Sequence, residues 1–271
     1  MPSVLATIPS PPSNAVEIGP LTLHFYGLAI ATGALLAVWL LRRRYAATGG
    51  DPDLADRTAV WAVMAGLVGA RLAFVSTNLD RFADRPWAVL FVWEGGLAFF
   101  GGLLFGALTA LWYLRRQGAL TPSFLDAGAP CVPLAHAVGR WGNYFNQELY
   151  GTPTGLPWGL EIDREPQPVH PTFLYESLSN LLLVGVLLSL ERTGRLARGS
   201  LIFVYLIGYG TIRFLLELIR TDTEFRLFGL SRNGYVALLV VLIGLSGLVW
   251  WNRRSTGMEP ADPAKAATVE E

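Results

Sequence analysis

The feature that most constrains this chain is the recurrence of apolar stretches long enough to cross a lipid bilayer. Seven such stretches can be drawn on the 271-residue sequence, at about 21–41, 58–77, 87–114, 124–141, 173–190, 201–219 and 235–251. About 20 apolar residues in a helix match the thickness of the hydrocarbon core. Because that core offers no water to backbone N–H and C=O groups, each stretch is expected to be helical. The sequence therefore predicts an all-α integral membrane protein with seven transmembrane helices.

Composition agrees with a membrane location and excludes other classes. Hydrophobic residues make up 52% of the chain and charged residues 15%, against about 25% charged in a typical soluble domain. The formal net charge is zero, so nothing indicates a nucleic-acid partner. The single cysteine, Cys131, lies in an apolar stretch, which excludes a disulfide within the chain and a cysteine-based metal site.

The arginines predict how the chain is oriented. Eleven lie at one set of loop ends: Arg42, Arg43, Arg44, Arg57, Arg115, Arg116, Arg192, Arg195, Arg198, Arg253 and Arg254. Six lie at the other: Arg81, Arg85, Arg164, Arg220, Arg226 and Arg232. Since basic residues concentrate on the cytoplasmic side, we expect an external N-terminus and a cytoplasmic C-terminus.

The same boundaries divide the chain into parts. Residues 1–20 form an external N-terminal segment, which lacks the basic start and apolar core of a cleavable signal peptide. Residues 21–254 form the membrane domain, with a small external head at about 142–172, between the fourth and fifth helices. Residues 255–271 are rich in Ala, Pro, Thr and Glu, which predicts a disordered cytoplasmic tail.

Residues 139–151 concentrate polar groups at one membrane boundary, in the order Gly-Arg-Trp-Gly-Asn-Tyr-Phe-Asn-Gln-Glu-Leu-Tyr-Gly. Arg140, Asn143 and Asn146 recur every three residues, which places them on one side of a helix end. An interfacial loop would explain the aromatic residues, but not this spacing. A charge near hydrocarbon costs several kcal/mol unless it is paired or hydrated, so such residues usually mark a functional site.

Other polar residues fall at the external ends of their predicted spans. Arg213 and Glu217 are four residues apart and can pair on one helical face. The sequence predicts a cavity open to the outer face, with these lining residues: Tyr26, Arg140, Asn143, Asn146, Glu148, Arg213 and Glu217. In the third span, Gly95-Gly96 and Gly101-Gly102 indicate either backbone facing a cavity or close helix packing through small residues.

Six groups of residues, in order along the chain, resemble the motifs of the prolipoprotein diacylglyceryl transferase family. They are Ile18-Gly19-Pro20 with His24-Phe25-Tyr26-Gly27-Leu28; Gly69-Ala70-Arg71; Trp93-Glu94-Gly95-Gly96-Leu97; residues 139–151; His170-Pro171 with Leu174-Tyr175-Glu176; and Gly208-Tyr209-Gly210 with Arg213-Phe214 and Glu217. The resemblance covers nearly the whole chain.

This resemblance implies transfer of the diacylglyceryl group of phosphatidylglycerol to the lipobox cysteine of prolipoprotein signal peptides. A thioether forms, glycerol phosphate leaves, and the site is in the bacterial cytoplasmic (inner) membrane among membrane lipids. Arginines aimed at the departing phosphate would stabilise its growing charge. We expect Arg140 and Arg213 to bind the headgroup, with Asn143, Asn146 and Gly151 in substrate binding. No cofactor or metal is expected.

The catalytic base is where the chain departs from the family. Many members have a histidine before the second glycine pair of the third span, and this chain has Phe100 there. Glu148 and Glu217 would orient the arginines and could accept a proton, Tyr26 is a neutral donor, and His24 is a possible substitute base. We expect the arginines to favour the thiolate by lowering its pKa, with no single base required. His136 is interpreted as a packing residue.

Other classes of function give different expectations. A transporter of an anionic or lipid solute would also use broken helices and buried arginines, but the two halves of the chain show no internal repeat. A membrane protease would need a catalytic pair or a zinc motif at membrane depth, and a purely structural protein would not need this concentration of polar groups.

Overall fold

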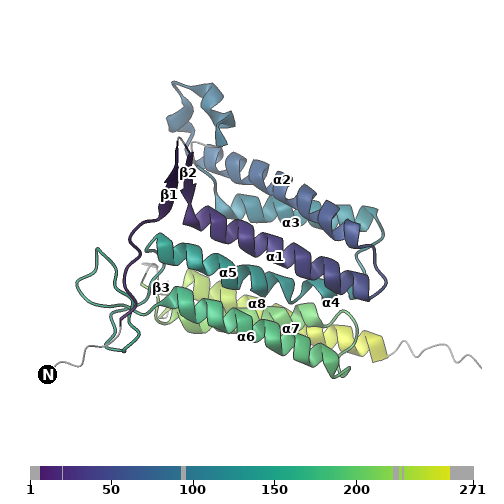
Figure 1. Cartoon of the computed structure of the whole chain (residues 1–271). Helices are drawn as coiled ribbons and strands as arrows, with labels where there is room; N and C mark the ends of the chain where they lie inside the picture. Colours follow the sequence, from purple (N-terminus) through teal and green to yellow (C-terminus); the bar gives the residue numbers. More distant parts are fainter. Residues whose placement is uncertain (1–6, 20, 93–95, 222–225, 228, 257–271) are drawn as a thin grey trace, which may run out of the picture. The chain divides into compact units, whose positions relative to one another are not determined.

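The computed structural model of the chain describes residues 7–19, 21–92, 96–221, 226–227 and 229–256. Its elements, in order, are β1 (Ala15–Ile18), β2 (Leu21–His24), α1 (Phe25–Ala47), α2 (Pro52–Thr77), η1 (Leu79–Phe82), η2 (Pro86–Leu90), α3 (Phe99–Arg116), α4 (Pro122–Gly128), α5 (Cys131–Phe145), α6 (Thr172–Arg192), α7 (Leu201–Glu217), β3 (Arg226–Leu227), β4 (Leu230–Ser231) and α8 (Arg232–Thr256) (Figure 1). The fold is thus largely helical, with two small antiparallel hairpins, β1–β2 and β3–β4, that were not predicted.

The surface of the helices is that of an integral membrane protein. Among the described residues, four helical stretches are long and apolar enough to cross a bilayer: Phe25–Ala47, Pro52–Thr77, Thr172–Arg192 and Arg232–Arg254. Large apolar side chains are exposed along them, such as Leu35 at 71% and Leu182 at 70%. Exposure on this scale would be unfavourable in water, so these surfaces fit a lipid environment.

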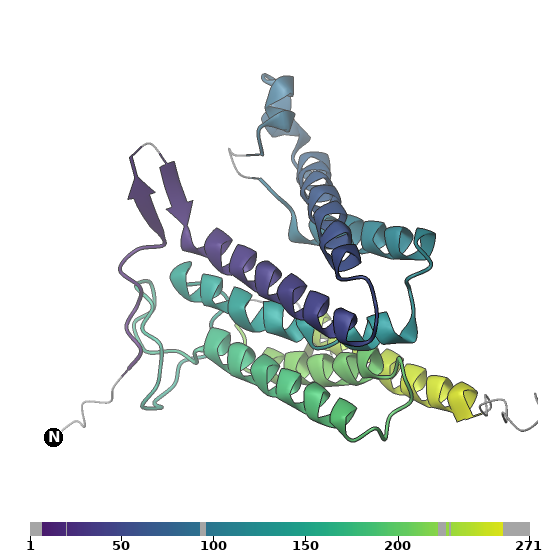
Figure 2. The same cartoon turned by 45° about the vertical axis from the view of Figure 1, so that its right-hand side comes forward.

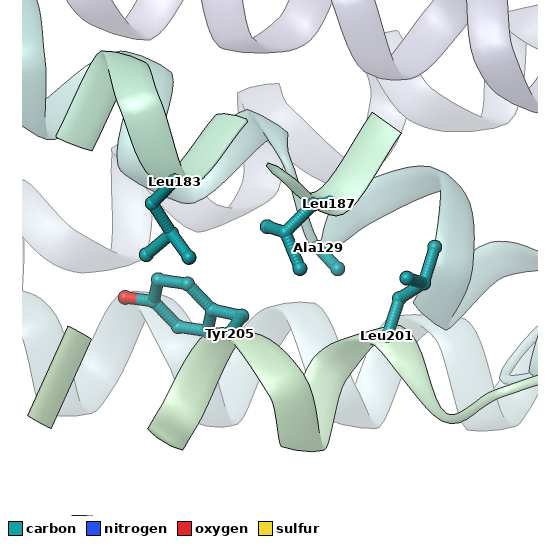
Figure 3. Close-up of a cluster of buried hydrophobic side chains, with 5 residues drawn as sticks. All are labelled: Ala129, Leu183, Leu187, Leu201 and Tyr205. Atoms are coloured by element: carbon teal, nitrogen blue, oxygen red, sulfur yellow. The ribbon is translucent and has the colours of Figure 1, made fainter. Parts of the chain in front are cut away.

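The chain divides into two compact units, which are described separately. The first comprises Met1–Trp39 with Leu125–Glu271, and the second Leu40–Phe124. In the first unit, α5 packs on α6, α6 on α7, and α7 on α8 (Figures 1 and 2). A buried cluster stabilises this arrangement: Leu183 and Leu187 of α6 face Leu201 and Tyr205 of α7, with Ala129 beside them (Figure 3).

Small residues bring α1 close to α5 in the first unit. A Cβ atom added at Gly33 would lie 2.7 Å from the carbonyl oxygen of Ala135, and one at Gly142 would lie 2.7 Å from the Tyr26 ring. Phe25 packs on Phe145 with ring centroids 4.6 Å apart. Association through small residues is usual between helices in membranes, where dispersion contacts require close approach.

The second unit is held by the same kind of packing between α2 and α3. A Cβ atom added at Gly101 would lie 2.4 Å from Cβ of Ala73, and one at Gly102 3.3 Å from Cβ of Ala70. Of the two interpretations of the glycines, close packing therefore holds for Gly101 and Gly102. Trp93, Glu94 and Gly95 lie outside the described residues.

Arg71 has a structural role in the second unit. Its Nε donates to the carbonyl of Val89 at 2.7 Å, Nη2 to Ala88 at 2.6 Å and Nη1 to Gly96 at 3.0 Å. Ala88 and Val89 lie in η2, and Gly96 lies in the irregular segment before α3. Backbone groups at membrane depth must find partners within the protein, and this buried guanidinium provides them.

Three predicted span boundaries were wrong. The third span does not begin a helix at residue 87, because η2 ends at Leu90 and α3 begins only at Phe99. The fourth is two helices, α4 and α5, which are separated at Pro130; proline lacks a backbone N–H and disfavours helical geometry in the preceding residue. The first begins with strand β2, so α1 starts at Phe25.

The N-terminal segment and the predicted head form one small packed structure. Ile8 bridges to Leu160, which also pairs with Val169. The Tyr144 hydroxyl donates to the carbonyl of Pro9 at 3.0 Å. Leu160, Ile162, Val169 and Phe173 are buried as its core, so residues 7–9 lie on the same side of the helices as the head.

The glycine packing of α2 and α3 gives a stability prediction. Gly101→Ala should lower the free energy of unfolding by about 1–3 kcal/mol, because the added methyl group overlaps neighbouring atoms. The measurement is the midpoint of thermal unfolding in detergent. Gly185→Ala on α6 is the matched control, since an added Cβ there meets nothing within 4 Å, and it should be neutral or stabilising. Equal effects of the two substitutions would contradict the packing argument.

Candidate functional site

The end of α5 carries the first part of the site. Arg140 and Asn143 lie one turn apart on this helix, and Arg140 Nη1 donates to Asn143 Oδ1 at 3.1 Å. Asn146 follows as the C-cap residue. The spacing of three seen in the sequence therefore does place these side chains on one face.

Glu148 is held at the centre of this group. Asn143 Nδ2 donates to Glu148 Oε1 at 2.8 Å, and Asn146 Nδ2 donates to the same oxygen at 3.4 Å. Tyr26, on the first turn of α1, packs against Gly142 and its hydroxyl lies within electrostatic range of Glu148 and Arg140. Four predicted site residues thus surround one carboxylate.

A second carboxylate pairs with Arg140 from α6. Arg140 Nη2 lies 2.7 Å from Glu176 Oε1, and the Glu176 side chain is only 2% exposed. The contact is an ion pair without the alignment of a hydrogen bond. Glu176 was not among the predicted site residues, although an acidic residue at the start of an apolar helix is itself a signal of a functional position.

The predicted ion pair at the end of α7 forms in the structure. Arg213 Nη2 lies 2.7 Å from Glu217 Oε2, with side-chain exposures of 15% and 4%. The Ser231 hydroxyl donates to Glu217 Oε1 at 2.5 Å. Among the described residues, the buried Arg213 Nη1 has no hydrogen-bond partner.

Tyr209 lies between the two ion pairs. Its hydroxyl is within electrostatic range of Arg140, Arg213 and Glu176. His136 lies beside it, with ring centroids 5.1 Å apart, as expected for a packing residue. Arg220 was counted above among the arginines at loop ends. In the structure it is buried and lies within electrostatic range of the Tyr209 hydroxyl. Arginines and carboxylates therefore gather together at one end of the first unit.

Among the described residues, His24 and Gly151 form no hydrogen bond with the side chains around Arg140. His24 is exposed at the end of β2, and in the part of the chain that the structure describes it makes no hydrogen bond or ion pair with the arginines or Glu148. Gly151 is buried, its N–H donates to His170 at 3.0 Å, and an added Cβ would lie 2.8 Å from His170 Cβ. The environment of Gly151 is one of backbone packing. The Phe100 side chain lies outside the described part of the structure.

Two cavities adjoin the polar cluster. An apolar groove of about 350 Å³ runs between α1, α5 and α6, with Phe25, Leu28, Trp141, Phe145 and Leu181 among its lining residues. Its wall includes Ala137, one turn before Arg140, and Ser177, which follows Glu176. A polar cavity of about 400 Å³ lies at the head and shares Phe145 with the groove.

The polar cavity contains an exposed contact between Gln147, just after α5, and Asp163, later in the head. Gln147 Nε2 donates to Asp163 Oδ2 at 2.6 Å, and the Asp163 N–H donates to Gln147 Oε1 at 2.9 Å. Hydrogen bonds from Gln147 and then from Ser10 hold the pKa of the Asp163 carboxyl below its usual range. The described residues contain no group of three or more His, Cys, Asp or Glu that could hold a metal ion.

Comparison with known proteins identifies the family. The prolipoprotein diacylglyceryl transferase family matches residues 13–250. The chain belongs to this family. Phosphatidylglycerol–prolipoprotein diacylglyceryl transferase 2 of Streptomyces coelicolor is 42% identical over 94% of this chain and 84% of its own length. The enzymes of the same name from Streptomyces griseus and Paenarthrobacter aurescens are 40% and 41% identical, over 98% and 88% of this chain and 85% and 81% of their own lengths.

Membership of the prolipoprotein diacylglyceryl transferase family confirms the resemblance drawn from the six motifs. It does not favour the transporter alternative, since the relatives are named as transferases. The family match includes the polar ends of α5, α6 and α7, where the two ion pairs lie.

The buried Arg140–Glu176 pair gives a second stability prediction. Glu176→Leu should destabilise the protein by about 3–5 kcal/mol, because it leaves a buried guanidinium without its charge partner. The double variant Arg140→Met with Glu176→Leu should regain most of that loss. Thermal unfolding in detergent measures both.

Asp56→Ala is the comparison for the Glu176 substitution. Asp56 pairs with Arg42, and both side chains are exposed, at 39% and 48%. Such a pair contributes at most about 1 kcal/mol. The proposed energetics are wrong if the double variant is as unstable as Glu176→Leu alone.

Proposed function

We propose that this protein transfers the diacylglyceryl group of phosphatidylglycerol to a cysteine thiol of prolipoproteins, the first step of lipoprotein maturation. The observation that carries the proposal is the pair of partly buried arginines at one end of the helices, Arg140 and Arg213, each held by a buried carboxylate, in a chain of this family. The relatives are named for the same lipid and protein substrates.

The arginines suit the charge that develops in this reaction. The cysteine sulfur attacks the glycerol carbon of the diacylglyceryl group, the carbon–oxygen bond to phosphate breaks, and glycerol phosphate leaves with the bond electrons. The thiol proton passes to the phosphate or to water. Donors in a site of low dielectric stabilise such a leaving group strongly, and Arg213 Nη1 is a buried donor without a partner among the described residues.

The carboxylates are proposed to orient the arginines. Glu176 and Glu217 contact Arg140 and Arg213 directly, and Glu148 reaches Arg140 through Asn143. Fixed guanidinium planes can offer paired donors to phosphate oxygens. Tyr26 adds a neutral donor beside them, and Asn146 helps to fix Glu148. For Gly151 we propose that any effect on substrate binding acts through its backbone packing.

The apolar groove is proposed to hold acyl chains. It is lined by aromatic and aliphatic side chains of α1, α5 and α6 and lies beside the helix faces that carry Arg140 and Glu176. A lipid lying there would have its tails among apolar residues and its phosphate near the arginines. The lipobox cysteine of a precursor would then approach from the membrane side as well.

The thiolate is proposed to form without a dedicated base. A free thiol has a pKa of about 8.5, so a few per cent is ionised at neutral pH. Neighbouring arginines favour the thiolate further. His24 is exposed on β2, where it lacks the buried environment of the arginines and carboxylates, which supports a role other than proton acceptance.

The arginine assignment is tested by transfer activity with phosphatidylglycerol and a lipobox peptide, with a diacylglyceryl adduct detected by mass. Arg140→Ala and Arg213→Ala should each lower kcat about 10²–10³-fold, the usual effect of losing a donor to a developing charge. Arg140→Lys should recover little, because a point charge cannot replace two planar donors. Near-normal activity of Arg140→Ala would remove the headgroup assignment.

His24→Gln is the control in the same assay, and a peptide with serine in place of cysteine is the blank. We expect His24→Gln to keep most of the activity. If it instead removes both activity and a titration near pH 6–7 while the protein stays folded, His24 is the base.

We further propose seven spans, an external N-terminus, and a location in the bacterial inner membrane. Three shorter helical regions, α3, α4 with α5, and α7, would complete the four long helices. Contacts at the two ends of the helices support the proposal that the N-terminus and the C-terminus lie on opposite sides of the membrane. Residues 7–9 join the head, whereas the Trp251 indole donates to the carbonyl of Arg198 at 2.7 Å, joining the end of α8 to the loop before α7.

The orientation predicts which introduced cysteines react with an impermeant thiol reagent added to intact cells. Pro157→Cys in the head should be labelled and Thr193→Cys after α6 should not. Both positions are exposed, and the natural Cys131 is buried, so background labelling should be low. Labelling at Thr193 with sparing of position 157 would reverse the orientation.

A further inference from the structure

The residue before Glu148 and the residue after it both have an unfavourable backbone conformation. Gln147 has φ of 50° and Leu149 has φ of 59°. In this left-handed region the Cβ of an L-residue approaches its own carbonyl oxygen, so residues other than glycine adopt it rarely. Among the described residues these are the two non-glycine positions with positive φ. Such strain persists only where surrounding contacts hold it.

The strained loop determines where Glu148 lies. After α5 ends, the chain turns back so that the Glu148 N–H donates to the Asn143 carbonyl at 3.1 Å. The Glu148 carboxylate then accepts from Asn143 Nδ2 at 2.8 Å, and Asn143 in turn accepts from Arg140. The turn at position 147 thus precedes a carboxylate that reaches Arg140 through Asn143.

The contacts that hold the loop come from the head. Gln147 and Asp163 exchange two hydrogen bonds, side chain to side chain at 2.6 Å and backbone N–H to side chain at 2.9 Å. Arg164 donates to the backbone carbonyl of Gln147, and the Thr172 hydroxyl donates to that of Leu149. Asp163 follows Ile162, whose side chain is buried in the head core. The anchor is therefore attached to a packed structure.

We propose that Gln147 and Asp163 are positioning residues, which hold the left-handed turn and thereby fix Glu148 against Asn143 and Arg140. The expected effect of these two residues on diacylglyceryl transfer rests on the proposed function. Their expected effect on the conformation of the turn does not. The simpler alternative is a surface contact that stabilises the head without influencing the site. The two differ in whether losing the contact lowers kcat, and in whether glycine at position 147 limits that loss.

Glycine at position 147 separates these alternatives, because it adopts positive φ without steric cost. Gln147→Ala loses the head contact and keeps the steric cost, so kcat should fall about tenfold. Gln147→Gly loses the contact but not the turn, and kcat should fall about threefold or less. KM for the lipobox peptide should change little in either variant.

Asp163 is tested in both backgrounds. Asp163→Ala should lower kcat about five- to tenfold in the natural chain and have no further effect in Gln147→Gly, because its partner is gone. Asp163→Asn should restore most of the activity, since its side-chain oxygen still accepts from Gln147 and the backbone N–H still donates. Glu161→Ala is the matched control: Glu161 is an exposed acid of the same head that contacts Thr7, and its loss should have no effect.

Amide hydrogen exchange provides a readout that does not need activity. Residues 146–150 should exchange faster in Asp163→Ala than in the natural chain and Glu161→Ala, because the turn opens more often. The inference is overturned if exchange there is unchanged, if Asp163→Ala stays within twofold of the natural kcat, or if its effect is equal in both backgrounds. Absence of transfer by the natural chain would instead overturn the proposed function, while the exchange experiment would still test the turn.

Discussion

Burial of charge in a medium of low dielectric is the constraint on which the site depends. Arg140 and Arg213 lie at the ends of apolar helices, where an isolated guanidinium would be strongly unfavourable. Each has a carboxylate at 2.7 Å, from Glu176 and Glu217. Because Glu176 is on α6 and Arg140 on α5, satisfying this charge also fixes two helices relative to each other. The Arg140–Glu176 pair therefore contributes both to the geometry of the site and to the packing of the first unit.

The close approach of α1 to α5 follows from the same requirement. Tyr26 reaches the electrostatic range of Arg140 and Glu148 only because Gly142 offers no side chain at the crossing. Where helices cannot rely on water to drive association, small residues at the contact supply dispersion. Gly142, in the polar stretch 139–151, is therefore part of how Arg140 is surrounded. This glycine does not need to touch a substrate to matter.

The sequence predicted the parts of this structure that follow from solvent and periodicity. Apolar length gave the helices, the spacing of three gave the shared face of Arg140 and Asn143, and the spacing of four gave the Arg213–Glu217 pair. It did not predict the break at Pro130 or the hairpin before Phe25, because hydropathy averages over local backbone preferences. Glu176 was missed for another reason. Its partner lies on a different helix, and no local pattern shows which helices become neighbours.

Arg71, Arg140 and Arg213 all lie in apolar stretches of the sequence, yet the structure gives them different kinds of partner. All three nitrogens of the Arg71 guanidinium donate to backbone carbonyls of its own unit. These bonds hold η2 and the segment before α3 in place, so an arriving anion would have to compete with the fold itself. Arg140 and Arg213 face carboxylates instead, and Arg213 keeps one buried nitrogen without a partner among the described residues. Carboxylate side chains can shift or share an arginine with a phosphate while the backbone stays intact. An arginine in an apolar helix needs a partner. If its partners are backbone carbonyls it is committed to the fold, whereas an arginine paired with a carboxylate can still bind an anion.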